Sequence, residues 1–351
     1  CSLFPTVIKI LKHKGRVRNP FVFIILGRYL IYDMDSNIEN DYYTIAFYNL
    51  ENLFDTFDDA YTNDDDFLPE SDRRWTEKRY QKKIRKLGQV ISQIGEKISR
   101  KVPTIVGLAE VENRLVVDDL INSSSLKEHN YNVVHYDSPD ERGIDVALLY
   151  KKELFELLHS ETYPLYLNAE NGERDYTRDV LLVKGNLNGE LVHILVNHWP
   201  SRRSGEDFTE EKRIKAAELV SNITYKINNE TDDAKIIIMG DFNDDPTSES
   251  VKKYLVNDTF YNPMERLINT GNGSLNHKRT WHLFDQIIFS KNFIGIEENK
   301  HSFKYAEVFD KHFLKEWKGK YKGNPFRTYI GKWYLGGFSD HFPVYVYLKK
   351  N

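Results

Sequence analysis

Apolar and polar residues alternate from residue 41 onward in a pattern that mixes strands with helices. Runs of four to eight residues rich in β-branched and aromatic side chains predict strands, and they occupy residues 43–47, 104–108, 144–150, 180–187, 191–198, 234–239, 285–289 and 344–348. Asn188 and Gly189 separate two of these runs, and both residue types reach positive φ readily. We therefore expect a tight hairpin between 180–187 and 191–198.

Two longer segments have the three- and four-residue apolar spacing of amphipathic helices. The first covers residues 76–100 and the second residues 209–227. Their apolar positions are Ile84, Leu87, Ile91, Ile94 and Ile98 in the first, and Ile214, Ala217, Val220, Ile223 and Ile227 in the second. Residues 55–72 are acidic and lack an apolar period. The acidic cluster at 63–66 lacks the glycine and glutamate spacing of a calcium loop, so we expect a solvated loop there.

No internal repeat and no Pro/Gly/Ser-rich linker divides residues 41–349. Hairpins mixed with helical crossovers favour one α/β (α+β) domain over residues 41–351. We predict a four-layer sandwich, in which two mixed β-sheets pack face to face and helices flank them on the outside.

Composition narrows the function classes. Of 351 residues, 40% are hydrophobic and 29% are charged, which excludes a disordered chain and a membrane bundle. The 49 Lys and Arg against 53 Asp and Glu leave a formal net charge of −4, so the basic field of a nucleic-acid-binding module is absent. The negative net charge argues less strongly against an enzyme that binds a cation in its active site. The single cysteine, Cys1, excludes an intramolecular disulfide and a thiolate zinc cluster.

Residues 1–40 form an N-terminal extension of different character. A basic stretch at 9–18 precedes an apolar run at 21–32 that Arg28 interrupts, and this run is too short to span a bilayer. Our hypothesis is that translation starts at Met34 and that the chain is cytoplasmic. If residues 1–33 are a genuine export or lipoprotein segment, the chain is extracytoplasmic.

Polar side chains follow the predicted strands at several places. They are Asn49 and Glu51, Glu110 and Glu112, His198, Asp241 with Asn243, Asp244 and Asp245, Asp285, and Asp340 with His341. Strand ends gather at one rim of a sheet, so these residues can share a cleft. Carboxylate and amide oxygens suit Mg²⁺ or Mn²⁺. Each residue alone is more simply a turn or capping residue, but that explanation fits the whole set poorly.

These strand ends resemble the endonuclease/exonuclease/phosphatase superfamily, whose fold is that of deoxyribonuclease I. The resemblance covers residues 43–348 and rests on the segments FYNLEN, GLAEVEN, VNHWPS, GDFND, DQIIFS and SDHFPV in that order. Ala109 stands where the family motif has Gln, and Glu110 is retained. The segments NLENLFD, RGIDVALLY, NHWPSR and NPFRTY…GGFSDHFPVY are similar to a bacterial nuclease-like branch.

The resemblance implies a metal-dependent phosphodiester hydrolase that uses Mg²⁺, with Mn²⁺ as an alternative. Phosphoester hydrolysis needs an activated water and a cation on a phosphate oxygen. By this resemblance Glu110 is the main metal ligand. Asn49 assists it, together with Glu51 or Asp340.

The same resemblance implies the catalytic roles. Asp241 positions or deprotonates the attacking water, and Asn243 hydrogen-bonds the phosphate. His341 donates to a phosphate oxygen while Asp285 holds it, and such a pair favours the imidazolium form. His198 lies beside the same phosphate as an acid or an electrostatic clamp.

Arginines near the motifs are candidates for substrate binding, because guanidinium groups match phosphate geometry. Arg178 is the preferred phosphate contact, since the family often has Arg before that strand. For Arg178, and equally for Arg142, Arg202 and Arg327, a surface ion pair is the simpler interpretation. Asp145 either orients His198 or only begins a strand, and the two interpretations have equal weight. Trp199 and Trp281 suit base stacking, but core packing is favoured for both.

The preferred substrate is nucleic acid, DNA or RNA, cleaved by an endonuclease. The domain shows no apolar segment for membrane docking, and nothing implies a stable protein partner, so we expect a monomer. A phosphatase or phosphodiesterase acting on a lipid or small phosphoester is the alternative within the superfamily. GDFND also fits part of the dinuclear metallophosphoesterase pattern, but the companion Asp-x-His and Gly-Asn-His motifs are missing in the required places. A catalytically silent binding module is the alternative of another class.

Overall fold

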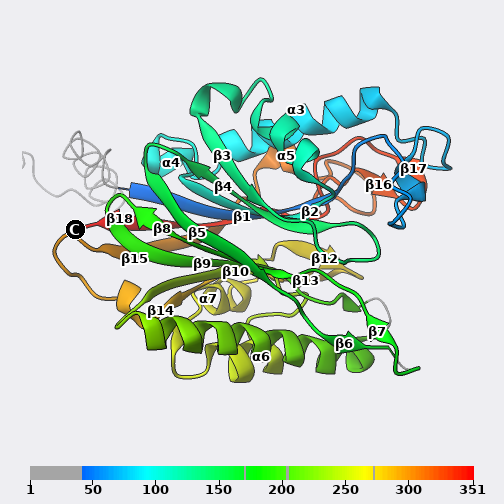
Figure 1. The fold of residues 1–351 in the computed structure, drawn as a ribbon. Coiled ribbons are helices and arrows are strands. Elements are labelled where there is room, and N and C mark those ends of the chain that lie inside the picture. Colours follow the sequence, from blue (N-terminus) through cyan, green and yellow to red (C-terminus); the bar gives the residue numbers. More distant parts are fainter. Residues whose placement is uncertain (1–41, 170, 203–204, 272) are drawn as a thin grey trace, which may run out of the picture. The chain divides into compact units, whose positions relative to one another are not determined.

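Two six-stranded mixed β-sheets form the centre of the protein (Figure 1). The computed structural model describes residues 42–169, 171–202, 205–271 and 273–351. The first sheet has the order β15 (His301–Val308), β18 (Val344–Lys350), β1 (Tyr42–Leu53), β2 (Ile105–Val111), β4 (Asp145–Lys151), β3 (Tyr131–His135). The second has the order β11 (Phe260–Tyr261), β14 (Asp285–Ser290), β10 (Lys235–Asp241), β9 (Glu190–His198), β8 (Val180–Leu187), β5 (Phe155–Tyr163).

The two sheets pack face to face through the alternating side chains of their strands. In β10, Ile237 and Met239 belong to the core between the sheets, while Ile236 and Ile238 belong to the core under helix α6 (Glu206–Glu230). This is the two-residue period of a strand buried on both faces. β1 and β2 contact β10 across the interface. Gly107 in β2 permits this approach, because a Cβ there would lie 2.5 Å from Met239 Sδ.

Helices complete the outer layers. α3 (Glu77–Gln93) and α5 (Arg114–Ile121) lie against the first sheet, and α6 packs with the π-helical segment η4 (Ser250–Val256) against the second (Figure 1). The predicted four-layer α/β sandwich of two packed sheets is confirmed. The described residues of this part, Tyr42–Asn351, cluster as one compact unit. The extension at residues 1–40 lies outside the described residues, as does residue 41.

Short elements connect these layers. They are η1 (Asp65–Phe67), α4 (Glu96–Ser99), η2 (Lys127–His129), β6 (Leu167–Asn168), β7 (Arg174–Asp175), α7 (Met264–Asn269), β12 (Leu275–His277), β13 (Thr280–His282), η5 (Lys291–Phe293), η6 (His312–Leu314), β16 (Tyr329–Ile330) and β17 (Trp333–Tyr334). β12 pairs with β13 and β16 with β17, so each pair is a small hairpin beside the sheets.

Every predicted strand is present, with shifted ends. Asn188 and Gly189, with φ of 43° and 84°, form the expected hairpin turn between β8 and β9. Three strands of five or more residues were not predicted from the sequence, namely β3, β5 and β15. In β5 only Phe155 is fully buried and most of the remaining side chains are exposed or half-buried, because this strand lies at a sheet edge and has no apolar alternation.

The helix predicted over residues 76–100 is wrong in its last part. α3 ends at Gln93. Gly95, with φ of 76°, interrupts the helical conformation before the short helix α4. Positive φ suits glycine and interrupts the helical ladder. Ile98, expected on the buried face, is 40% exposed. The second helix extends three residues beyond each predicted end.

The acidic segment at 55–72 is largely loop, as predicted, with the single 3₁₀ turn η1. It is partly anchored, however, because Phe67 stacks on Phe54 with ring centroids 4.4 Å apart and Asp64 is buried. None of the helices within the described ranges is both long and apolar enough to cross a bilayer.

Candidate functional site

The ends of β1 and β2 carry backbone irregularities at the residues singled out by the sequence. The β1–β2 register shifts between Asn49 and Leu53, and the β2–β4 register shifts at Glu110. Glu51 and Glu110 have φ of 52° and 60°, in the left-handed region that non-glycine residues rarely adopt. Bulges and such outliers often occur beside active sites because they redirect side chains.

Asn49 connects the two sheets. Its Nδ2 donates to Asp241 Oδ2 on β10 at 3.0 Å and to Glu110 Oε1 on β2 at 3.4 Å. Its Oδ1 accepts from the Glu51 N–H at 2.9 Å. The Asn52 N–H holds the other Glu110 oxygen at 2.8 Å. Carboxylates from both sheets are therefore brought together at one amide group.

The second sheet contributes three adjacent strand ends. In the pairing register, Asp241 lies opposite His198 on β9 and opposite Asp285 on β14. His198 Nε2 is 3.8 Å from Asp241 Oδ2 and 4.0 Å from Glu110 Oε1, and all three side chains are at least largely buried. Strand ends that are remote in the sequence therefore place these three side chains close together.

His341 joins the same group from the loop before β18. Its Nδ1 is 2.6 Å from Asp285 Oδ2, and its Nε2 is 4.0 Å from both Asp241 Oδ2 and Asp340 Oδ1. Burial opposes protonation of His341, but the Asp285 carboxylate outweighs it and raises the pKa of His341 well above its ordinary value. Asp285 thus holds His341 at Nδ1 and favours its protonated form, while Nε2 lies 4.0 Å from Asp241 Oδ2.

The site concentrates negative charge. Burial, and then the charge of Asp285, raise the pKa of Asp241 to about 7, while burial and Asp340 raise the pKa of Glu51 to about 6. Ligand atoms of Asp241, Asp285 and His341 lie within 4.8 Å of one another, in a group of the kind that can hold a metal ion. Together with the Asn49 amide, the side chains of Glu51, Glu110, Asp241, Asp285 and Asp340 form an oxygen-rich donor set. A divalent cation there would offset the repulsion that helps raise the pKa of Asp241 and of Glu51. The residues present therefore fit a hard cation.

Glu51 binds a chain segment that the sequence analysis did not connect with it. Its carboxylate accepts from the Thr328 N–H at 2.5 Å and lies 3.4 Å from Arg327 Nε. Arg327 Nη2 is 2.7 Å from Asp340 Oδ2, and this charge lowers the pKa of Asp340 despite its burial. The role of Lys83 was also not predicted from the sequence. Its Nζ donates to the Glu51 carbonyl. The sequence feature that could have indicated this contact is a lysine within the apolar face of α3.

The GDFND loop is held by buried ion pairs. Asn243 Nδ2 donates to the Trp199 carbonyl at 3.0 Å, and its N–H donates to Asp241 Oδ1 at 2.9 Å. Arg202 donates to the Asn243 carbonyl at 2.7 Å and pairs with Asp244. Asp244 also pairs with Arg213 at 2.7 Å, and both side chains are buried. Asp244 and Arg202 therefore support the loop that carries Asp241.

Two other predicted substrate-binding residues have structural partners. Arg178 is buried, pairs with Asp140 at 3.0 Å and donates to the Trp199 carbonyl at 2.9 Å. This position favours a supporting role over the predicted phosphate contact. Asp145 accepts from the Ser138 N–H at 2.9 Å and lies 3.2 Å from His135 Nε2. It is the first residue of β4, which agrees with the interpretation that it begins a strand rather than with the equally weighted one that it orients His198.

The positions of Arg142, Trp199 and Trp281 are consistent with the roles expected from the sequence. Arg142 donates to Asn52 Oδ1, and Asn52 in turn holds Glu110, so Arg142 stands at the edge of the site. Trp199 is 1% exposed and packs against Phe242, which confirms core packing. Trp281 is half-buried and stacks on Phe342 with centroids 5.9 Å apart.

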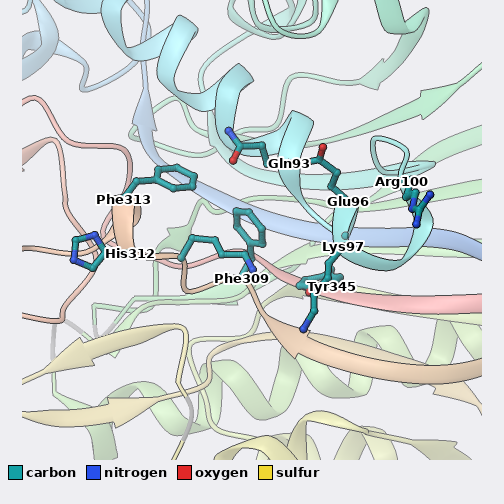
Figure 2. A pocket seen from close by; sticks show the side chains of 10 residues that line it. Gln93, Glu96, Lys97, Arg100, Phe309, His312, Phe313 and Tyr345 are labelled. Atoms are coloured by element: carbon teal, nitrogen blue, oxygen red, sulfur yellow. The ribbon is translucent and has the colours of Figure 1, made fainter. Parts of the chain in front are cut away.

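A separate pocket lies away from this group of residues. Figure 2 shows it beside the α3–α4 junction, with a volume of about 770 Å³ and walls that include Gln93, Arg100, Phe313 and Tyr345. It contains no candidate catalytic residue. The chemistry predicted from the strand ends therefore belongs to the rim where β1, β2, β9, β10 and β14 meet.

Comparisons with known proteins agree with this fold. The sequence profile described as the Endonuclease/Exonuclease/phosphatase family matches residues 44–350. No curated protein matches the sequence. An endonuclease/exonuclease/phosphatase family protein from Bacteroides thetaiotaomicron is similar in structure, with a TM-score of 0.56 and 18% identity over 88% of this chain and 95% of that chain.

Two further solved structures are similar over comparable lengths. TDP2 from D. rerio, complexed with a single-strand DNA product, has a TM-score of 0.53 and 16% identity over 88% of this chain and 99% of that chain. A Bacteroides thetaiotaomicron mannosyl-6-phosphatase has a TM-score of 0.52 and 19% identity over 87% and 99%. At these identities the likeness shows the fold.

The buried Asp244 ion pairs give a stability prediction. Asp244→Ala leaves the buried Arg213 guanidinium without its carboxylate, so the free energy of unfolding should fall by about 3–5 kcal/mol. Urea denaturation measures this change. Asp232→Ala, at an exposed position, is the control and should change it by about 0.5 kcal/mol or less. A loss under about 1 kcal/mol in Asp244→Ala would contradict the assigned supporting role.

Proposed function

Because the chain belongs to the endonuclease/exonuclease/phosphatase family, we propose that it is a divalent-metal-dependent phosphodiester hydrolase that cleaves nucleic acid. One observation carries the proposal. Asn49 hydrogen-bonds carboxylates of both sheets, Glu110 and Asp241, and the imidazoles of His198 and His341 reach within 4.0 Å of the same Asp241 oxygen. Carboxylates, an amide and two imidazoles in one place are the groups that phosphodiester hydrolysis requires.

Glu110 and Asn49 are the residues we assign to the metal, with Asp340 as a further ligand. A bound Mg²⁺ or Mn²⁺ neutralises charge on the phosphate and lowers the pKa of water. Both Glu51 oxygens accept bonds from the segment that carries Thr328, so we assign Glu51 to positioning that segment and Arg327.

Asp241 is the general base in this proposal. Its pKa, raised to about 7 by burial and Asp285, is close to that of an effective base near neutral pH. The protonated His341, oriented by Asp285, donates from Nε2 to a phosphate oxygen. His198 lies on the other side of Asp241 and suits stabilisation or protonation of the leaving oxygen. Asn243 Nδ2 donates one N–H to the Trp199 carbonyl, and its second N–H is the donor that we assign to a substrate phosphate.

Nucleic acid is the substrate we favour, and a small phosphomonoester is the second candidate. The structural relatives include a protein bound to a single-strand DNA product and a mannosyl phosphatase. The same rim chemistry serves both classes, so the substrate depends on the surface around it. Arg142 at the edge of the site, half-buried beside Asn52, offers one cation toward a substrate phosphate.

An activity panel tests the proposal directly. Plasmid DNA, single-stranded RNA, a phosphoinositide and a sugar phosphate are incubated with the protein and Mg²⁺, Mn²⁺ or Ca²⁺. We expect nicking or cleavage of nucleic acid with Mg²⁺ or Mn²⁺, and its loss in EDTA. Cleavage of the phosphoinositide or sugar phosphate alone would reject the nuclease and keep the hydrolase. Inactivity on all four with every metal would support the silent module.

Two substitutions test the catalytic roles. Asp241→Asn removes the base and His341→Ala removes the imidazolium, so each should lower kcat by about 10²–10⁴-fold. Thermal melting checks that both variants remain folded, and Glu298→Gln, at an exposed position, serves as the unchanged control. Wild-type rates in a folded Asp241→Asn or His341→Ala variant would refute the assignment of that residue.

A further inference from the structure

A basic, aromatic loop adjoins the candidate site. Residues 315–325, which we call the basic loop, carry four lysines and one glutamate in a chain whose formal net charge is −4. Backbone bonds close the loop at its base, from Glu316 N–H to the Asn324 carbonyl and from Gly323 N–H to the Glu316 carbonyl, both at 2.8 Å. The loop is therefore closed at its base, and Lys318, Lys320 and Lys322 lie between the closing bonds.

Large aromatic side chains are exposed on and near this loop. Trp317 is 64% exposed and Tyr321 is 43% exposed, and Trp333 on the neighbouring β16–β17 hairpin is 71% exposed. Lysine ammonium groups accompany two of these rings, with Lys318 Nζ 4.4 Å from the Trp317 ring centroid and Lys320 Nζ 5.3 Å from that of Tyr321. Rings packed into a core would be buried, so core packing does not account for them.

A small cavity connects the basic loop with the catalytic residues. It has a volume of about 110 Å³, and its walls include Glu316 and Tyr321 from the loop and Arg327 and Asp340 from the site. Asp340 Oδ1 is 4.0 Å from His341 Nε2, so the cavity is next to the imidazolium. A chain that lies along the basic loop can therefore place a phosphate near His341.

Exposed cations also occur on the β12–β13 hairpin. Asn276 of β12 lines the cavity, and the turn between β12 and β13 carries Lys278 and Arg279, both exposed. Positive side chains attract a polyanionic backbone, while exposed rings stack on unpaired bases. Bases within a duplex are already stacked on one another and offer no free face.

We propose that the basic loop, with Trp333, is a docking platform for single-stranded nucleic acid that guides the strand into the candidate site. This inference rests on the proposed function and specifies its substrate class. Trp317 and Tyr321 stack on successive bases, and Lys318, Lys320 and Lys322 contact phosphates. An anionic membrane is disfavoured as the occupant, because the loop tip, WKGKYK, has no aliphatic side chain to insert beside its rings.

Binding measurements with the full chain in EDTA test the platform. Fluorescence anisotropy gives the affinity for a labelled single-stranded DNA, for the same strand in a duplex and for phosphatidylserine vesicles. Wild type should bind the single strand more tightly than the duplex. The Trp317→Ala/Tyr321→Ala variant should weaken single-strand binding at least about fivefold per ring. The control Tyr225→Ala/Tyr305→Ala removes two exposed rings, 68% and 50% exposed, elsewhere on the molecule and should bind as wild type.

Salt dependence distinguishes the lysines from the rings. The variant Lys318→Ala/Lys320→Ala/Lys322→Ala should lower the slope of log Kd against log salt by about 0.7 for each phosphate that no longer has a lysine partner, whereas the ring variant should keep the wild-type slope. The lysine variant should hydrolyse bis(p-nitrophenyl) phosphate at the wild-type rate, because none of its three lysines lines the cavity that Asp340 borders.

The outcomes separate this inference from the proposed function. If the wild type hydrolyses the small ester but the ring and lysine variants bind the single strand as tightly as wild type, the platform is rejected and the hydrolase stands. Loss of vesicle binding in these variants, with unchanged DNA binding, also rejects it and assigns the loop to a membrane. If the small ester is not hydrolysed with any metal but the loop variants lose single-strand binding, the hydrolase fails and the docking surface stands.

Discussion

The face-to-face packing of the two sheets is the constraint on which the site depends. Side chains such as Met239 fill the space between the sheets, and Gly107 leaves room for it. Because β1, β2, β9 and β10 end at the same rim, this packing forces several acids and imidazoles into a small volume. Asn49 is the only amide in the group that hydrogen-bonds both Glu110 and Asp241 in the part of the chain the structure describes.

The close packing of negative charge is the main electrostatic property of the candidate site. Buried carboxylates repel one another, and the raised pKa of Asp241 and of Glu51 records that repulsion together with burial. The protein offsets part of it with Arg327, Lys83 and the His341 imidazolium, each of which lies beside a carboxylate or its backbone. In our proposal a bound divalent cation would offset the remaining repulsion, and it would then attract a phosphate ester as substrate.

Much of the fold could be predicted from the sequence because the central strands are buried on both faces. Such strands appear in the sequence as continuous apolar runs. The prediction missed β5, whose edge position removes that pattern, and it extended a helix past Gly95, where positive φ stops it. For the site, the strand ends were visible as polar residues after apolar runs.

The network around the site was harder to predict. Lys83 lies in the middle of a helix and reaches the Glu51 carbonyl only through tertiary packing. The family resemblance favoured Arg178 as a phosphate contact, because the family often has Arg before that strand, whereas the fold buries its side chain against Asp140. Tertiary packing brings such polar residues next to partners that are distant in the sequence. Local residue spacing therefore does not predict which polar residues lie in the site and which are buried beside it.

Titration of Mn²⁺ into the wild type and Glu110→Gln, followed by the loss of the free-ion electron paramagnetic resonance signal, tests the central claim most directly. We predict that the wild type binds Mn²⁺ and that the substitution weakens binding at least about tenfold, because changing even an outer-shell partner of a metal ligand typically costs about 10–100-fold in affinity. Equal Mn²⁺ affinity in wild type and a folded Glu110→Gln variant would contradict a metal centre at the meeting point of the two sheets.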